Sequence, residues 1–431
     1  MTINQVIEKY QHILEEPKDL EKLVDQAADK RVVMLGDASH GTSEYYTGRS
    51  AISKQLILNG DISFVAVEGD WPDCYRINRY IKGYADAGAS AHQVLLEFTR
   101  WPTWLWANQE MLEFIEWLRA YNDRVDKEEE KIGFYGIDVY GLWESLDIVI
   151  TYLQERVPES VDAVYAAFKC FQPYARDAQR YAHATALVPT SCEDQVLTLL
   201  TELRSAGFMY QASDREAYFN AEQNAVVAKN AEHYYRTMLR GDEVSWNVRD
   251  HHMAQVLDNL LTFHGPKSKA LVWEHNTHIG DARYTDMVRD GMVNVGQLAR
   301  ERYGQENVYL IGLGAYSGTL IAAEAWGLPP REMRMPDSLW ASWEAQFHEV
   351  GEYDRFILMS EVKDHLSFQQ WRGQRAVGVV YNPRREIGNY VPTILGKRYD
   401  AYVYIDRSQA LEPLYVEAEP EYTPETFPTG V

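Results

Sequence analysis

The sequence predicts an α/β protein with a mostly parallel central sheet flanked by helices, plus a large helical insertion. Short apolar runs without alternation recur along the chain, as expected for strands that are buried on both faces. Segments with helical periodicity separate these runs, and this alternation is typical of βαβ units in a parallel sheet. One long stretch breaks the alternation and predicts the insertion.

Eight apolar runs are the expected strands. They cover residues 32–35, 64–67, 132–135, 270–273, 308–311, 356–359, 376–380 and 401–405. Ligand sites of parallel sheets form outside the carboxyl ends of the strands. The polar residues that follow these runs are therefore the first candidates for a site.

Helices are expected at residues 44–59, where Ser43 is a plausible N-cap, and at residues 103–121. Residues 143–265 contain no convincing strand, and long helices are expected there at 214–240 and 243–263. We interpret this stretch as a helical insertion within one domain of residues 1–431, either a lid over the site or a packing layer. The Pro- and Glu-rich tail after Glu412 is expected to be loosely ordered.

Composition narrows the class of protein. The chain has 431 residues, and 42 basic against 64 acidic residues give a formal net charge of −22. This balance disfavours a nucleic acid or an anionic membrane surface as partner, and no apolar run reaches the ~18 residues of a membrane span. The three cysteines lie far apart in the sequence without a CxxC motif, which fits a reducing compartment. Without a signal-peptide pattern, these features predict a cytoplasmic enzyme whose partner is a small molecule, and they leave its oligomeric state open.

The loop after the first long strand carries the first candidate. Residues 36–42 read Gly-Asp-Ala-Ser-His-Gly-Thr, which places His40 between a strand and a helix. Imidazole titrates near neutral pH, so His40 could take a proton from water, or it could be a loop residue bonded to backbone. Ser39 is not a nucleophile elbow, because Asp37 stands where GxSxG needs its first glycine.

Two further strand ends carry candidate groups. Glu68 follows the run 64–67 and could orient His40, accept a proton, bind a metal, or serve as a structural acid paired with an arginine. Residues 274–278, Glu-His-Asn-Thr-His, place His275 and His278 after the run 270–273. Three imidazoles and a carboxylate can bind zinc or iron, or can hydrolyse an ester without a metal. Asp138, another strand-end acid, is expected to be structural.

These motifs resemble the erythromycin esterase family. The resemblance rests on residues 36–42, on Glu44 and Arg49, on residues 67–71 and on residues 274–278. It implies a three-layer α/β core and hydrolysis of a macrolide lactone or other ester without a required metal or other cofactor. It also implies that His40 is the general base, and that Glu68, Arg49, His275 and His278 occupy active-site positions.

Finer roles are our interpretation. Glu68 would orient the base or the water, Arg49 would hold Glu68 or Asp37, and His275 and His278 would face the substrate carbonyl. The expected substrate-binding residues are Asp37, Glu44, Trp71 and Asn276. Asp37 departs from the family, because its macrolide-inactivating members have Glu at this position, one methylene longer.

Three functions stay open on the sequence. The first is a metal-free ester hydrolase with His40 as base and no covalent intermediate. The second is a metal-dependent hydrolase with His40, Glu68, His275 and His278 as ligands. The third is a non-catalytic binding protein that keeps the pocket.

Overall fold

The computed structural model describes residues 1–174, 176–187, 191–210, 215–239 and 241–415. Its main sheet contains nine strands: β1 (His12–Ile13), β2 (Val32–Leu35), β3 (Ile62–Val67), β4 (Gly133–Gly136), β5 (Lys269–Trp273), β6 (Val308–Ala322), β7 (Arg331–Met335), β8 (Arg355–Leu358) and β11 (Ala401–Ser408). Strands β9 (Arg372–Arg375) and β10 (Tyr390–Thr393) form a separate antiparallel pair.

The centre of the main sheet is parallel. Its order is β1-β8-β11-β6-β2-β5-β3-β4, and neighbours from β11 to β4 all run parallel. Strands β8, β1 and β7 pair antiparallel at the margins. The strands β2 and β5 are buried almost throughout, which is why their sequences show apolar runs without alternation.

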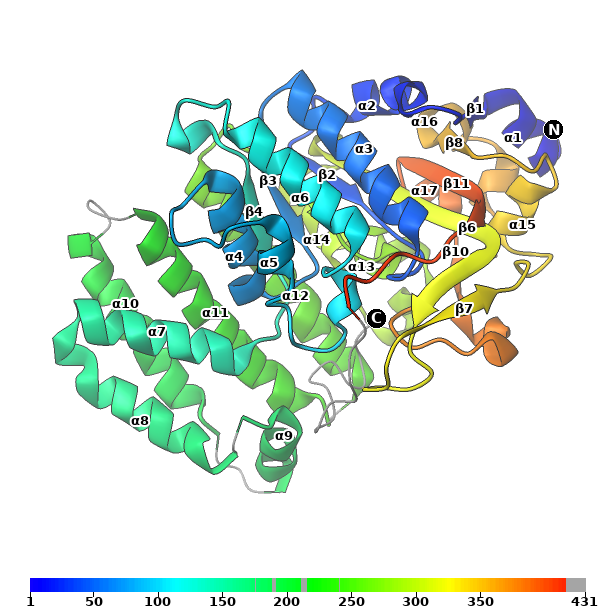
Figure 1. The fold of residues 1–431 in the computed structure, drawn as a ribbon. Helices are drawn as coiled ribbons and strands as arrows, with labels where there is room; N and C mark the ends of the chain where they lie inside the picture. Colours follow the sequence, from blue (N-terminus) through cyan, green and yellow to red (C-terminus); the bar gives the residue numbers. More distant parts are fainter. Residues whose placement is uncertain (175, 188–190, 211–214, 240, 416–431) are drawn as a thin grey trace.

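Helices cover both faces of this sheet and produce three layers (Figure 1). The helices outside the insertion are α1 (Ile3–Tyr10), α2 (Glu21–Ala27), α3 (Ser43–Asn59), α4 (Trp71–Lys82), α5 (Ala91–Leu95), α6 (Gln109–Asn122), α13 (Asn276–Ile279), α14 (Val295–Tyr303), α15 (Trp343–His348), α16 (Met359–Val362) and α17 (Leu395–Arg398). Alternate residues of each central strand join two different apolar cores. Val33 and Leu35 face the core of α2, α3 and α6, whereas Val32 and Met34 face that of α12 and α14.

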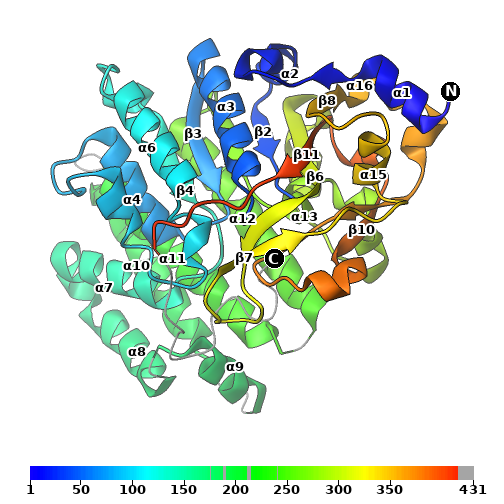
Figure 2. The same cartoon turned by 45° about the vertical axis from the view of Figure 1, so that its right-hand side comes forward.

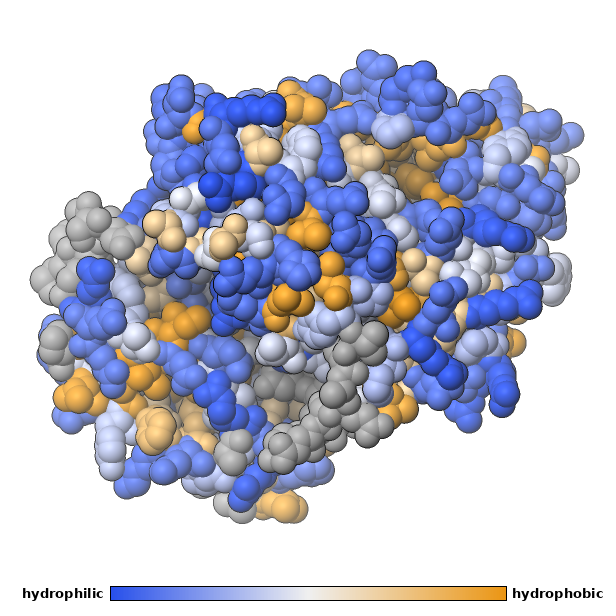
Figure 3. All heavy atoms as spheres, viewed as in Figure 1, coloured by the Kyte–Doolittle hydropathy of each residue, from blue (hydrophilic) through white to orange (hydrophobic). Residues whose placement is uncertain are grey.

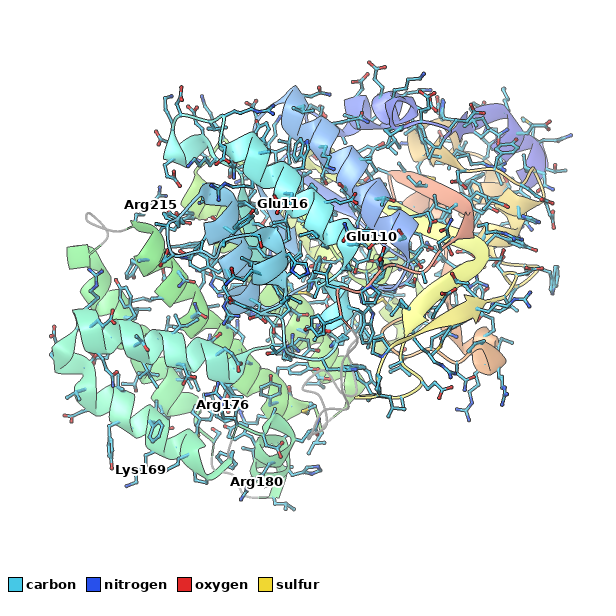
Figure 4. All side chains as sticks on the ribbon, viewed as in Figure 1. Glu110, Glu116, Lys169, Arg176, Arg180 and Arg215 are labelled. Carbon is cyan, nitrogen blue, oxygen red and sulfur yellow. A yellow bond between two sulfur atoms is a disulfide. The ribbon has the colours of Figure 1, made fainter. Side chains whose placement is uncertain are left out.

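The helical insertion is confirmed. It comprises α7 (Leu142–Arg156), α8 (Val161–Phe171), α9 (Ala178–Leu187), α10 (Glu193–Tyr210), α11 (Arg215–Thr237) and α12 (Asp242–His264), and its described residues contain no strand. Helices α7 to α11 bury a third apolar core, and Figure 2 shows α7 to α10 grouped to one side of the sheet. The outer part of the insertion presents Lys169, Arg176 and Arg180 (Figure 4).

Helix α12 joins the insertion to the sheet. Its residues Val256, Leu257 and Leu260 belong to the apolar core that also contains Val32 and Met34. With 23 residues it is about 34 Å long, about twice the ~17 Å of the five-residue β5 that follows it. The chain returns from the end of α12 to the amino end of β5, so the first turns of α12 extend past the carboxyl edge of the sheet.

Some local predictions are wrong. Residues 376–380 form no strand: Val377 and Val380 make single bridges to Ser39 and Ala323, and the run is apolar because its valines are wholly or partly buried there. Thr42, not Ser43, occupies the N-cap of α3, without a side-chain cap hydrogen bond. Residues 214 and 240, at the ends of one expected helix, and 416–431, most of the expected loose tail, lie outside the described residues.

The cysteines are also closer than their sequence positions indicate. Cys170 and Cys192, 22 residues apart, form a disulfide that links the end of α8 to the residue before α10, and Cys74 is free and buried. No helix in the described part of the chain is long and apolar enough to cross a membrane. The face in Figure 3 is largely hydrophilic, with apolar residues in separate small groups.

Candidate active site

A cavity lies at the carboxyl edge of the sheet beside His40 and Glu68. The volume of this cavity is about 40 Å³, which is enough to hold ordered water. Its lining combines apolar and charged side chains. The lining residues are His40, Glu68, Gly69, Asp70, Asp73, Phe98, Arg100, Pro102, Leu105, Trp106, Asp138, Tyr140, Arg249 and Val379.

His40 is held by the loop between β2 and α3. This loop packs tightly on β6, because a Cβ on Gly41 would lie 1.8 Å from the Ile321 carbonyl oxygen. The Nδ1 atom of His40 lies 3.5 Å from Asp37 Oδ1, and Arg49 Nη1 forms an ion pair of 2.7 Å with the other oxygen of Asp37. Arg49 thus pairs with Asp37, one of its two expected partners, on the Nδ1 side of the imidazole.

Glu68 occupies the other side of His40. Its Oε1 lies 3.8 Å from His40 Nε2 and 3.5 Å from His278 Nε2. Its Oε2 accepts a hydrogen bond of 2.7 Å from the main-chain N–H of His275. Three strand ends, those of β2, β3 and β5, therefore converge on one carboxylate.

His275 and His278 belong to this network but do not line the cavity. Both side chains are fully buried, and the His275 ring lies 5.1 Å from the His40 ring. His275 Nδ1 accepts from the Thr277 main chain at 3.3 Å, and His278 Nδ1 donates to Asp250 at 2.9 Å. The Trp246 ring stacks on His278 at 4.5 Å, which fixes that imidazole in place.

The sequence analysis missed two residues of this network, Arg249 and Asp250 on helix α12. Arg249 donates from Nη2 to Glu68 Oε1 at 2.7 Å, and from Nε and Nη2 to the two oxygens of Asp138 at 2.9 and 2.8 Å. Its Nη1 lies 3.3 Å from His278 Nε2. Neither residue follows an apolar run, so the search for polar strand ends could not find them. Asp138, expected to be structural, pairs with Arg249 and also lines the cavity.

Burial and neighbouring charges shift several pKa values. Burial would raise the pKa of Asp37, but Arg49 and His40 outweigh it and the pKa is lowered. Burial also opposes ionisation of Asp138, yet Arg249 lowers its pKa. Burial, with His40 nearby, lowers the pKa of His275 to about 3, so this ring is neutral at pH 7. Asp37 and Asp138 are the carboxylates held ionised by arginines.

Glu274 behaves in the opposite way. Its two carboxyl oxygens are buried and have no hydrogen-bond partner among the described residues. Burial, followed by the charge of Glu68, raises the pKa of Glu274 well above its usual value. The Glu274 carboxyl is therefore harder to ionise than an exposed one, in contrast to those of Asp37 and Asp138.

None of the four expected substrate-binding residues lines the cavity, and Asp37 lies on the Nδ1 side of His40 instead. Trp71 is buried against Tyr75 and Tyr135 and donates to Asn220 at 2.9 Å. Glu44 accepts from the Gln409 main chain at 2.8 Å. The Asn276 side chain donates to the Leu313 carbonyl at 2.6 Å and so ties α13 to β6.

The His, Asp and Glu side chains of this site are also potential metal ligands. Within the described ranges, no group of three or more His, Cys, Asp or Glu side chains has the arrangement of a metal site. Arg249 already lies between His278, Glu68 and Asp138, and Asp250 pairs with the other nitrogen of His278. The donor set therefore fits an ion-pair network better than a metal centre.

Comparisons with known proteins identify the family of the chain. The erythromycin esterase family profile matches residues 58–408. The chain is 21% identical to a protein of Bacillus subtilis named as a hydrolase, YbfO, over 70% of this chain and 68% of that protein. It is also 21% identical to erythromycin esterase type II of Escherichia coli, over 92% of this chain and 94% of that protein.

Solved structures share the fold. A succinoglycan biosynthesis protein superimposes with a TM-score of 0.76 at 19% identity, over 96% of this chain and 98% of that chain. A histidine-to-asparagine variant of the erythromycin esterase EreC in its open conformation gives a TM-score of 0.62 at 17% identity, over 91% of this chain and 94% of that chain. Because the family profile covers most of the sequence, the chain belongs to the erythromycin esterase family and is a hydrolase of that family.

Proposed function

We propose that this hydrolase cleaves carboxylic esters by direct attack of water, with His40 as the general base and no acyl-enzyme. The observation that carries the proposal is the position of His40, which lines the cavity between two carboxylates, with Asp37 at Nδ1 and Glu68 at Nε2. The cavity is large enough for the attacking water.

The proton path follows from this geometry. His40 Nε2 takes a proton from the water as its oxygen attacks the ester carbonyl, and the carbonyl π electrons move to the oxygen to form a tetrahedral oxyanion. Asp37 stabilises the imidazolium, as a carboxylate at Nδ1 does in other hydrolases. When the C–O bond breaks, the bonding pair leaves with the alkoxide oxygen, which takes the proton from His40.

The proposal changes the roles expected for His275 and His278. Neither ring lines the cavity, and His275 is neutral at pH 7, so we assign both to positioning rather than to the carbonyl. His275 acts through its main-chain N–H on Glu68, and His278 acts through the Asp250–Arg249 network.

The substrate class is a further proposal. A macrolide lactone is the substrate that the family resemblance suggests, with inactivation of the antibiotic as the biological role. However, about 40 Å³ is far below the 300–1,000 Å³ of pockets that hold drug-sized ligands. We therefore expect small activated esters to react readily, and a macrolide to react only if the cavity walls separate.

A hydrolysis screen tests the function. Wild type and His40→Ala are assayed on p-nitrophenyl acetate and on macrolides, with and without a chelator, and circular dichroism checks the fold. We expect His40→Ala to lose about 10³-fold or more of kcat, with chelator-independent turnover in the wild type. A folded His40→Ala that stays active would refute the mechanism, chelator-sensitive turnover would favour the metal-dependent alternative, and absence of turnover on every ester would favour a binding protein.

We also propose a cytoplasmic location, on the basis of composition. The Cys170–Cys192 disulfide makes this testable, because disulfides are rare in reducing compartments. Quenching the cells in acid and alkylating the denatured protein should label all three cysteines if the protein is cytoplasmic. Protection of Cys170 and Cys192 together would argue for an oxidising compartment.

A further inference from the structure

We infer that Arg249, carried by the helical insertion, is a positioning residue that holds the Glu68 carboxylate beside His40. The inference rests on the proposed function. It assigns the insertion a part in the chemistry, beyond a lid or a packing layer.

The contacts of Arg249 fix both the guanidinium and its partner. Two parallel N–H groups bind Asp138 at 2.9 and 2.8 Å, the bidentate arrangement that orients a guanidinium most strongly. The same Nη2 then reaches Glu68 Oε1 at 2.7 Å. The same oxygen lies 3.8 Å from His40 Nε2. Arg249 therefore acts on the carboxylate oxygen that faces the base.

Asp138 is itself held by the insertion. Its Oδ1 accepts from the Val139 main chain at 2.7 Å, and its carbonyl oxygen lies 3.0 Å from His252 Nε2 on helix α12. Asn230 on α11 contacts the other nitrogen of His252 at 2.8 Å. Residues of α11 and α12 thus hold Asp138, the partner of Arg249, in place. Several contacts together determine the position of the guanidinium.

The charges explain why an arginine is needed. Glu68, Asp138 and Asp250 are buried within one network. Burial and the nearby charge of Glu68 raise the pKa of Glu274. Burying unpaired carboxylates in one place is costly, and a neighbouring like charge promotes protonation. Asp138 has a lowered pKa chiefly because Arg249 overcomes its burial. The same guanidinium also contacts Glu68, so one arginine pairs with two buried carboxylates.

Arg249 and Arg49 form a matched pair around His40. Arg49 comes from α3 and holds Asp37 on the Nδ1 side at 2.7 Å. Arg249 comes from α12 and holds Glu68 on the Nε2 side at 2.7 Å. The base is therefore set between two arginine-bound carboxylates, one from the core and one completed by the insertion.

Chemical rescue tests the inference. Arg249→Ala should lose about 100-fold of kcat on p-nitrophenyl acetate, and millimolar guanidinium ion should restore at least about tenfold by entering the space left by the side chain. The acid limb of the pH profile should move to higher pH in Arg249→Ala, because a carboxylate that loses its guanidinium partner protonates more readily. Guanidinium should reverse this movement.

A matched control separates positioning from packing. Arg300 on α14 is another buried arginine with two carboxylate partners, Asp281 at 3.1 Å and Asp400 at 2.8 Å, and it lies outside the cavity lining. Arg300→Ala should lose stability without a change in pH profile and without rescue. If Arg249→Ala fails to fold, Arg249→Lys keeps the charge but loses the bidentate hydrogen bonds to Asp138, so kcat should fall while the acid limb moves little; an unchanged kcat would overturn the inference.

The outcomes distinguish this inference from the proposed function. If His40→Ala is inactive but folded Arg249→Ala keeps wild-type kcat and pH profile, the inference fails and the function stands. Equal rescue of Arg300→Ala by guanidinium would also overturn it, because the effect would then be general. An active His40→Ala would instead remove the proposed mechanism.

Discussion

The strand-end loops and the helical insertion contribute to the site in different ways. The loops after β2, β3 and β5 supply His40, Glu68 and the two buried histidines, and the His275 main chain donates to Glu68 between two of these loops. Helix α12 supplies Arg249 and Asp250, which contact those groups through side chains alone. The sheet thus places the candidate groups, and the insertion adds charged side chains that pair with them.

Replacing the carboxylate where the two regions meet should have the largest of the remaining effects. Glu68→Gln keeps the shape but removes the charge between His40 and Arg249. We expect a loss of about 10²–10³-fold in kcat/KM, since a preorganised charge at the reacting groups is lost. Steady-state kinetics on p-nitrophenyl acetate and a thermal melt measure the two consequences. Activity within about threefold of wild type would show that the two regions do not meet at this residue.

The second carboxylate of helix α12 should matter less. Asp250→Asn leaves His278 Nδ1 without its carboxylate acceptor, so the ring loses its preferred tautomer. We expect a loss of about 10- to 100-fold in kcat, the range seen when a carboxylate that orients a histidine is removed. Asp258→Asn is the matched control, because Asp258 is on the same helix but pairs with Arg302. Equal losses in both variants would indicate damage to the helix rather than to the site.

The smallest expected effect concerns Asp73, which lines the cavity. Burial, reinforced by Asp70, raises the pKa of Asp73 to about 7 from a usual 3.8. Between these values the native state holds a proton that the unfolded chain has released, so the free energy of unfolding falls as pH rises from 4 to 7. Asp73→Asn removes this dependence.

The measurement is Tm at pH 5 and pH 8. The Tm of Asp73→Asn minus the Tm of wild type should be larger at pH 8 than at pH 5, by about 2 °C or more. Asp86→Asn, at an exposed carboxylate paired with Arg79, is the control and should not show this gain. A constant difference between wild type and Asp73→Asn at both pH values would mean that Asp73 ionises normally.

Much of the fold could be predicted, and the errors have local causes. The run 376–380 is as apolar as a strand because its valines are wholly or partly buried, but it has no neighbour with which to form a ladder. Trp71 and Asn276 stand next to site residues in the sequence, yet their side chains point into packing and main-chain contacts. Adjacency along the chain therefore identified the loops correctly without identifying which side chains line the cavity.

The sequence by itself determined the parallel sheet, the helical insertion and the histidines at the strand ends, because burial on both faces of a strand and helical periodicity are written in neighbouring residues. Only the tertiary structure decided that Arg249 meets Glu68, 181 positions away, and that Cys170 meets Cys192. An arginine on a long helix shows no local sign of its partner. Its pairing depends on how far α12 extends past the sheet edge, which the packing of the whole chain sets.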